Sequence, residues 1–246
     1  MAGDKELLEA IDLIKTYNGK RVVDRISIAL NRREVIGLLG PNGAGKTTTF
    51  YMMMGLTHPD EGRIYLDGRD ITNAPMYMRA REGVNFLAQE PSVFRKLTVE
   101  QNLLAIMENT NIPRHEMKER VDQLLSELNI RGLAKQKASS LSGGERRRLE
   151  ISRALITEPR FMLLDEPFAG IDPITLNDIK QIIGQLKSRG IGILISDHNV
   201  RETLDVCDLA YIINKGHIIE YGSPEKIVNS KMARSAYLGD NFIYKG

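Results

Sequence analysis

One eight-residue stretch, Gly40–Thr47, constrains this sequence more than any other. It reads glycine, four residues, then Gly-Lys-Thr. The apolar run Val35–Leu39 before it is typical of a buried strand, and Thr48–Leu56 after it has a helical pattern. A strand that turns through glycines into a helix points several backbone N–H groups, and the positive helix end, at one spot. The stretch therefore predicts a P-loop, a site for phosphate groups.

Each residue type in this loop has its own task. Glycine permits the tight turns, Lys46 adds a positive charge near the β- and γ-phosphates, and the Thr47 hydroxyl can hold Mg²⁺. The fixed positions should arise by chance in only about 1% of chains of this length, which disfavours a plain glycine-rich turn. The predicted nucleotide-binding residues are Gly40, Pro41, Asn42, Gly43, Ala44, Gly45, Lys46, Thr47 and Thr48.

A pair of acids follows a second apolar run, Phe161–Leu164. Asp165 lies at the end of the predicted strand, where a carboxylate can bind Mg²⁺. Glu166 points elsewhere because successive strand side chains alternate, so it is free to act as general base toward water. An acidic pair alone is weak evidence, but downstream of a P-loop it supports nucleotide hydrolysis.

Composition excludes several classes of protein. With 34 basic and 32 acidic residues the net charge is +2, which gives no support to coating of nucleic acid or membrane by charge. The one cysteine, Cys207, excludes an intramolecular disulfide and suits a reducing compartment. No stretch approaches the roughly 20 apolar residues that span a bilayer. We expect no nucleic-acid partner and no direct membrane insertion, so a membrane role requires a partner protein.

Buried strands, among them Ile191–Ile195, alternate with amphipathic helical patterns, which favours a mostly parallel sheet covered on both faces. Residues 6–30 and 62–71 instead resemble antiparallel strands with Asn-Gly and Asp-Gly turns. Residues 98–157 are nearly all helical. We therefore predict an α/β fold: a P-loop (RecA-like), mostly parallel sheet core with an antiparallel β subdomain and an inserted α-helical subdomain. Residues 1–246 would form one domain, with the insertion at about 90–160.

A second glycine-rich loop, Leu141–Glu145, also precedes a helical pattern and so predicts a second anion site. The P-loop of each chain already holds one nucleotide, which leaves this site for a phosphate bound to another chain. A GTPase would need a guanine-specific Asn-Lys-x-Asp. The nearest match, Asn214–His217, lacks the acid and is interpreted as a turn.

Together these motifs resemble the ATP-binding-cassette (ABC) ATPase family along the whole chain. The loops at 40–47 and 141–145 match its Walker A and signature motifs, with Glu145 where glutamine is commoner, and Asp165-Glu166 matches its Walker B pair. Four further positions match in family order: the adenine-stacking aromatic Tyr17, the Q-loop glutamine Gln89, the D-loop aspartate Asp172 and the switch histidine His198.

This resemblance implies an ATPase that uses ATP and Mg²⁺. Two copies would meet head to tail and sandwich two ATP molecules, each between one P-loop and Ser142, Gly143 and Gly144 of the other copy. Glu166, His198 and Gln89 would be catalytic, and Thr47, Gln89 and Asp165 would hold the metal. Asp172 and Tyr17 would complete the nucleotide site.

Within the family the chain is most similar to the ATP-binding subunits of lipopolysaccharide export transporters. This implies two integral membrane partners, docking near Phe94, and a position on the cytoplasmic face of the inner membrane. Two alternatives stay open: the ATPase of a branched-chain amino-acid importer, and a soluble, non-transport ABC ATPase. Arg146–Arg148 is interpreted as a solvated or inter-subunit patch.

Overall fold

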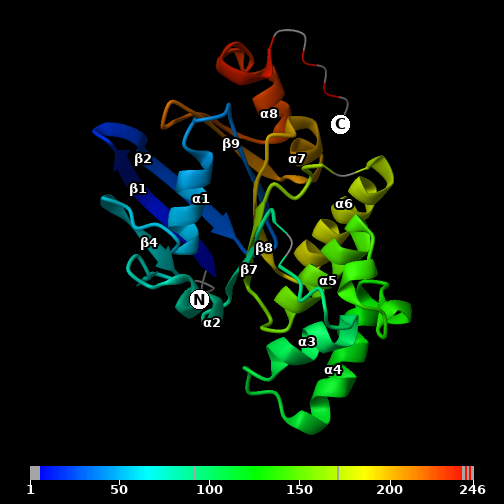
Figure 1. Ribbon diagram of the computed structural model, residues 1–246. Helices are drawn as coiled ribbons and strands as arrows, with labels where there is room; N and C mark the ends of the chain where they lie inside the picture. The colour runs from blue at the N-terminus through cyan, green and yellow to red at the C-terminus, as the bar shows by residue number, and fades with distance from the viewer. Residues whose placement is uncertain (1–5, 91, 171, 240–241, 243, 245–246) are drawn as a thin grey trace, which may run out of the picture.

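The computed structural model describes residues 6–90, 92–170, 172–239, 242 and 244. Figure 1 shows two sheets with helix α1 (Lys46–Met54) between them and further helices on the far side of the larger sheet. Among the described residues, no helix is long and apolar enough to cross a membrane. The mixed parallel core, antiparallel sheet and helical segment confirm the predicted fold class.

The larger sheet has the strand order β10-β9-β3-β8-β7-β6. Its strands β3, β6, β7, β8 and β9 pair in parallel, and β10 returns antiparallel to β9. Every residue of β3 and β8 is buried, as expected for strands covered on both faces. The strands are β3 (Val35–Leu39), β6 (Val84–Leu87), β7 (Phe161–Asp165), β8 (Gly192–Ser196), β9 (Leu209–Asn214) and β10 (His217–Gly222).

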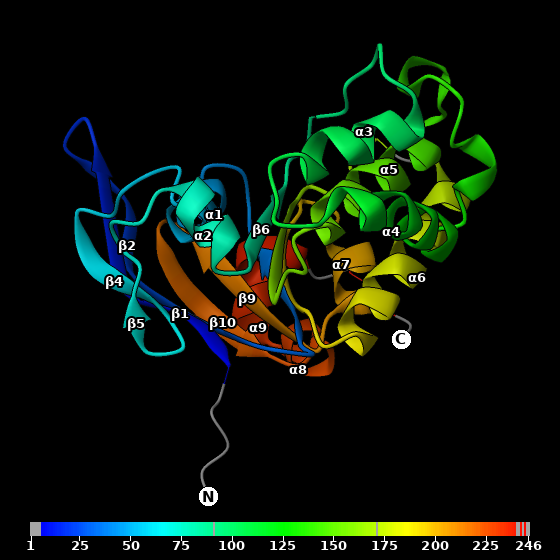
Figure 2. The ribbon, with the colours of Figure 1, turned by 90° about the horizontal axis from the view of Figure 1, so that it is seen from below.

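The smaller sheet is antiparallel, with the order β2-β1-β4-β5. The Asn18-Gly19 turn joins its two long strands, and both turn residues have positive φ, as a tight hairpin requires. Figure 2 shows this sheet on the side of the molecule away from helices α3–α5. The strands are β1 (Leu7–Tyr17), β2 (Lys20–Asn31), β4 (Glu61–Leu66) and β5 (Arg69–Asp70).

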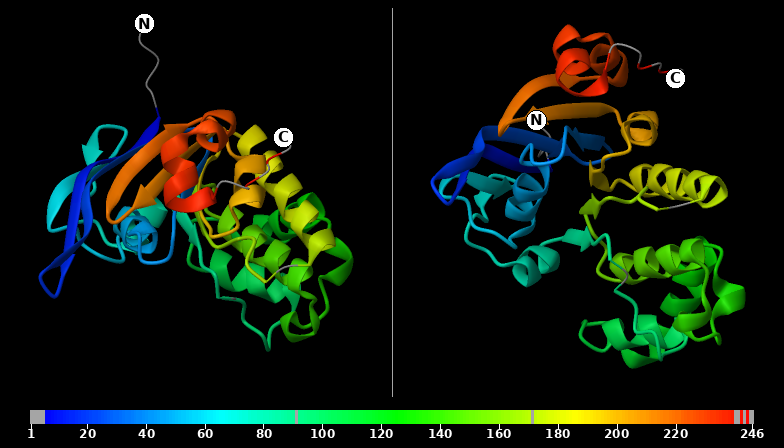
Figure 3. Two further views of the ribbon diagram at one scale, coloured as in Figure 1. Left: turned by 90° about the horizontal axis from the view of Figure 1, so that it is seen from above. Right: turned by 45° about the horizontal axis from the view of Figure 1, so that its top comes forward.

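A helical segment interrupts the sheet between β6 and β7. It contains α3 (Val99–Met107), α4 (Arg114–Glu127) and α5 (Gly143–Leu155), with short 3-10 turns between α4 and α5. The Thr98 hydroxyl and the Gln101 side chain form a capping box at the start of α3. The right-hand view of Figure 3 places this segment at the opposite end of the molecule from the C-terminal helices.

The remaining helices join or follow the later strands. Helix α2 (Met76–Arg81) precedes β6, and α6 (Pro173–Ser188) connects β7 to β8. Gly190 follows α6 with φ of 91°, a left-handed conformation that favours glycine just beyond a helix end. Helix α7 (Val200–Val206) precedes β9, and after the β9–β10 hairpin come α8 (Pro224–Asn229), α9 (Lys231–Ala233) and a π-helical turn, Arg234–Leu238.

The sequence prediction missed one strand. Val84–Leu87 forms β6 at the edge of the parallel sheet, but it has only four residues and contains Asn85. Four residues with one polar side chain show neither the length nor the apolar continuity that marks a buried strand. The Asn85 amide donates to the Ala154 carbonyl at 2.8 Å and the Thr157 hydroxyl at 2.6 Å, which explains why the sheet tolerates it.

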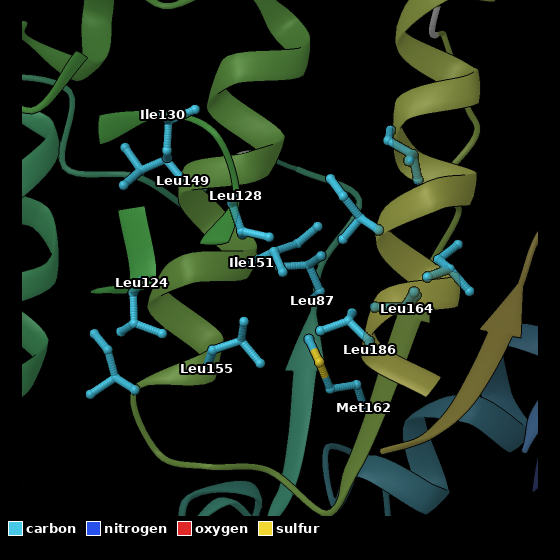
Figure 4. Close-up of a cluster of buried hydrophobic side chains, with 14 of the residues drawn as sticks. Leu87, Leu124, Leu128, Ile130, Leu149, Ile151, Leu155, Met162, Leu164 and Leu186 are labelled. Carbon is cyan, nitrogen blue, oxygen red and sulfur yellow. The ribbon is translucent and has the colours of Figure 1, made fainter. Parts of the chain in front are cut away.

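The apolar core has separate parts on the two faces of the large sheet. One lies between the two sheets and includes the buried side chains of Phe50, Met52 and Met53 from α1. The other joins the helical segment to the sheet. Figure 4 shows it, with side chains from α4, α5 and α6 meeting those of β6 and β7: Leu87, Leu124, Leu128, Ile130, Leu149, Ile151, Leu155, Met162, Leu164 and Leu186.

We predict that Leu149→Ala lowers the free energy of unfolding by about 2–5 kcal/mol, because Leu149 is fully buried and the substitution leaves a cavity. Urea denaturation followed by circular dichroism measures this. Leu56→Ala is the matched control: Leu56 is 46% exposed and should cost less than about 0.5 kcal/mol. Equal losses in the two variants would contradict the assigned core.

Candidate functional site

The P-loop lies between β3 and α1, and its glycines are required by close packing. A Cβ on Gly40 would lie 2.0 Å from the Ile213 carbonyl oxygen, and one on Gly45, where φ is 109°, would lie 2.4 Å from the Val22 oxygen. The Ala44 carbonyl accepts a hydrogen bond from the Gly216 N–H in the β9–β10 turn. Strand β2 and this hairpin therefore fix the loop in place.

Lys46 is buried within the loop that precedes it. Its ammonium group donates to the carbonyl oxygens of Gly40 at 2.6 Å and Pro41 at 3.1 Å. Burial lowers the pKa of Lys46, while Glu166 and Asp197 oppose that shift. The loop borders a cavity of about 200 Å³, lined by Val22, Asn42, Gly43, Ala44, Gly45, Lys46, Thr47, Thr48 and Glu166. Seven of the nine predicted loop residues therefore face one space.

Asp165 ends β7, and Glu166 follows it at the carboxyl edge of the sheet. Burial, together with the nearby negative charges of Glu166 and Asp197, raises the pKa of Asp165 to about 6. The Glu166 backbone is left-handed, with φ of 44°, and its N–H donates to the Ser196 carbonyl at 2.7 Å. This turn directs the Glu166 side chain away from the strand.

Two predicted catalytic side chains converge on one oxygen of Glu166. The Gln89 amide donates to Glu166 Oε2 at 2.7 Å, and His198 Nδ1 lies 3.5 Å from the same atom. Asp197 is fully buried behind them and accepts the N–H groups of Phe168 and Asn199. Gln89 lies 77 residues before Glu166, and His198 lies 32 residues after it. The three side chains meet because β6 and β8 flank β7 in the sheet.

The negative charges of Glu166 and Asp197 act on both Asp165 and Lys46, and the Arg147 guanidinium opposes the rise in the pKa of Asp165. Desolvated negative charge of this kind suits a divalent cation with oxygen ligands. Asp165 and the exposed Thr47 hydroxyl are residues of the type that Mg²⁺ prefers. The donor set at this edge therefore fits Mg²⁺.

The second glycine-rich loop forms the start of α5. Ser142 is the N-cap: its hydroxyl accepts the Glu145 N–H, and the Glu145 carboxylate accepts the Ser142 N–H at 2.8 Å. A cavity of about 250 Å³ lies between this helix end and Glu166. Its lining includes Gln89, Gly143, Gly144, Glu166 and Asp172. Glu166 thus borders both cavities, whereas none of residues 142–144 lines the P-loop cavity within the described chain.

Asp172 and Tyr17 take different positions. Asp172 accepts the Thr175 N–H at 3.1 Å at the start of α6, as expected of an N-cap. Tyr17 ends β1, is 45% exposed, and has the Lys15 ammonium 5.6 Å from its ring centroid. Tyr17 is not among the residues lining the P-loop cavity, so in this structure it borders open solvent.

The interpretation of Arg146–Arg148 as a solvated patch is wrong for Arg147, which is only 8% exposed. Its guanidinium donates to the Ala88 carbonyl at 2.9 Å and to Glu150 at 3.1 Å. Sequence reasoning also missed Asp197. A charged residue is normally expected at the surface, so the residue type alone did not indicate that either side chain is buried. Arg147 is buried because α5 packs on the Gln89 segment, and Asp197 is buried in the turn after β8. The position of Asp197 directly before the switch histidine was the available signal.

Comparison with known proteins shows which family this chain belongs to. Residues 23–169 match the protein-family profile described as ABC transporter. The chain belongs to the ABC transporter family. It is an ATP-binding ATPase of a transport system, as the motifs predicted. The relatives include the "lipopolysaccharide export system ATP-binding protein LptB" of Acidithiobacillus ferridurans, 56% identical over 96% of this chain and 98% of that protein.

Further relatives agree with this assignment. The protein of the same description from Escherichia coli K12 is 49% identical over 96% of this chain and 98% of its own length. Among solved structures, the ADP conformation of MJ1267, an ATP-binding cassette of an ABC transporter, matches with a TM-score of 0.85 and 30% identity. That match covers 96% of this chain and 99% of MJ1267, which supports the ABC fold over nearly the whole length.

The raised pKa of Asp165 generates a pH-dependent prediction for the metal-free protein. Because the folded-state value, about 6, exceeds the ordinary 3.8, ionisation of Asp165 destabilises the fold above pH 6, and this penalty is absent below pH 3.8. Asp165→Asn should therefore raise the free energy of unfolding at pH 7.5 by at most about 3 kcal/mol. The gain should shrink by roughly half at pH 5.

Urea denaturation in EDTA at the two pH values measures this effect. Added Mg²⁺ is the control, because it should stabilise the wild-type protein and leave Asp165→Asn unchanged. A gain of the same size at both pH values would contradict the assignment of the penalty to this carboxylate.

Proposed function

We propose that this chain is the ATPase subunit of a lipopolysaccharide export transporter, which powers extraction of lipopolysaccharide from the inner membrane toward the outer membrane. Relatives with that description are 49–56% identical over 96% of the chain. The proposal that the chain hydrolyses ATP rests on one observation: Gln89 and His198 converge on the Glu166 carboxylate, next to the P-loop cavity.

In the proposed reaction, ATP binds with its phosphates against the N–H groups of residues 42–48 and the Lys46 ammonium. Glu166 accepts a proton from a water molecule as that oxygen attacks the γ-phosphorus, and ADP leaves. His198, 3.5 Å from Glu166, holds the γ-phosphate and orients the carboxylate. Thr47, Asp165 and Gln89 would hold Mg²⁺, which would supply charge neutralisation on the phosphates.

Each chain supplies half of two reaction centres in this proposal. Ser142, Gly143 and Gly144 lie at a helix N-terminus, which suits an anion. Gly143 and Gly144 border a different cavity from the P-loop. A second copy in head-to-tail orientation would bring its residues 142–144 to the γ-phosphate. Two ATP molecules would then be sandwiched, with Asp172 at the interface and Tyr17 closing on the adenine.

The two integral membrane subunits would dock near Phe94, on the cytoplasmic face of the inner membrane. Phe94 is 45% exposed, and the Arg153 guanidinium lies 4.8 Å from its ring centroid. The Asn102 side chain bonds both the N–H and the carbonyl of Phe94, so the ring is presented from a fixed backbone. Pro91, three residues before Phe94, lies outside the described residues. The domain unit is proposed as residues 1–246 with the helical insertion at about 90–160.

We predict that Glu166→Gln binds MgATP, hydrolyses it at least about 100-fold more slowly, and accumulates as a dimer, because the general base is lost while the binding groups stay. Size-exclusion chromatography with light scattering in saturating MgATP measures the dimer. A monomer under those conditions would overturn the two-chain reaction centre.

The matched control is Ser142→Arg in the same Glu166→Gln background. Its arginine blocks the anion site on α5, so the dimer should be lost while ATP still binds the monomer, measured by calorimetry. Loss of ATP binding as well would place Ser142 in the same chain's site and contradict the proposal.

Affinity capture from detergent-solubilised membranes tests the transport role. Wild-type chain should retain lipopolysaccharide-export membrane subunits, and Phe94→Ala should retain at least about fivefold less, while ATP binding by the purified chain stays unchanged. Capture of amino-acid permeases, or of nucleic-acid-associated proteins, would favour the two alternative functions instead.

A further inference from the structure

Arg79, on helix α2, is a fully buried arginine outside the site described above. Burial lowers the pKa of its guanidinium to about 10, so it stays charged at neutral pH. Within the part of the chain that the structure describes, no carboxylate lies at ion-pair distance from it. A buried charge without a counterion is costly, and such a group persists only where several hydrogen bonds hold it.

Four backbone carbonyls supply those hydrogen bonds. The guanidinium donates to Met52 at 2.9 Å and Met53 at 2.7 Å, both in the last turn of α1. It also donates to Ala74 at 2.8 Å and Thr72 at 2.9 Å, in the segment between β5 and α2. The carbonyls at the end of a helix lack partners within it and carry its negative end, so a cation there is stabilising.

Gly55 makes room for this arrangement. It ends α1 with φ of 77°, and a Cβ there would lie 2.7 Å from the Ala74 oxygen and 2.8 Å from Arg79 Nε. The turn that ends α1, the 72–74 segment and the guanidinium are therefore packed as one unit.

This unit connects two parts of the catalytic machinery. The other end of α1 carries Lys46 and Thr47 at the phosphate site. Helix α2 leads through β6 to Gln89, which bonds Glu166. We propose that Arg79 is a positioning residue that fixes the phosphate-binding helix against the segment that carries Gln89, and so sets nucleotide affinity. The inference rests on the proposed binding of ATP at the P-loop.

The arrangement also places groups of opposite charge at the two ends of α1, a helix of nine residues. The negatively charged nucleotide phosphates would meet its positive N-terminus, and the positively charged guanidinium meets its negative C-terminus. Without Arg79, α1 would lose both its fixed place and the cation at its C-terminus. The N–H groups that face the phosphates would then be less ordered before nucleotide binds, and binding would bear the cost of ordering them.

Calorimetric titration of the full chain with MgADP, with steady-state ATPase assays, tests this role. Arg79→Gln should weaken ADP binding about tenfold, and Arg79→Lys, which keeps the charge but not the planar fork, about threefold. The KM for ATP should rise in parallel. Arg160→Gln is the control: Arg160 donates to the Glu82 carbonyl just after α2 but does not bond α1, so its ADP affinity should stay within twofold.

A second pair of variants keeps the test decisive if Arg79→Gln does not fold. Gly55→Ala leaves Arg79 in place but pushes on Ala74 and the guanidinium, and should weaken ADP binding at least threefold. Gly68→Ala has the same positive φ, 79°, with no atom within 4 Å of the new Cβ, and should bind ADP as the wild type does.

The outcomes separate the inference from the proposed function. Wild-type ADP affinity in folded Arg79→Lys and Gly55→Ala would overturn the positioning role while leaving the ATPase assignment intact. If the wild-type chain binds no MgADP, or if Lys46→Ala binds it equally well, the proposed role of the P-loop in nucleotide binding is contradicted, and the inference about Arg79 falls with it.

Discussion

The parallel register of three central strands is the constraint on which the site depends. Leu38 of β3 pairs with Ser196 of β8, and Ser196 pairs with Asp165 of β7. Because parallel strands end at the same edge, the residues that follow them meet there: the P-loop after β3, Glu166 after β7 and the Asp197–His198 pair after β8. A shift of one residue in either pairing would separate the phosphate loop from the base. Every residue of β3, β7 and β8 is buried, so a shift of one residue would move each side chain to the opposite face and out of the packing it makes there.

Charge balance at that edge explains why the chain suits a charged, metal-bound ligand. Three carboxylates lie within reach of one another, two of them buried, and the pKa of Asp165 and of Asp197 is raised. Lys46 holds its ammonium on backbone carbonyls rather than on these acids. The site is thus electrostatically incomplete by itself. The proposed magnesium–nucleotide complex would bring cation and anion together, with the cation near the acids and the phosphates against Lys46 and the loop N–H groups.

Much of this could be predicted from the sequence because it depends on local patterns. The Gly40–Thr47 loop, the Asp165-Glu166 pair and the glycine-rich loop at Leu141–Glu145 are each set by a few neighbouring residues. The short strand Val84–Leu87 could not, since its strand character comes from pairing with β7. Burial of Arg147 and Arg79 could not be predicted either. An arginine is expected at the surface, and the carbonyl groups that bind these two side chains include those of residues distant in the sequence. The predicted roles of Tyr17, Asp172 and Ser142 await a bound nucleotide and a second chain.

The left-handed backbone at Glu166 has a consequence for genetics. A φ of 44° suits glycine, asparagine or aspartate and is tolerated by unbranched side chains, whereas valine, isoleucine and threonine adopt it only with strain. Replacements at this position therefore divide into two groups. Unbranched ones change the chemistry on an intact turn. Branched ones also distort the turn that aligns β7 with β8, and their phenotypes would mix misfolding with lost hydrolysis.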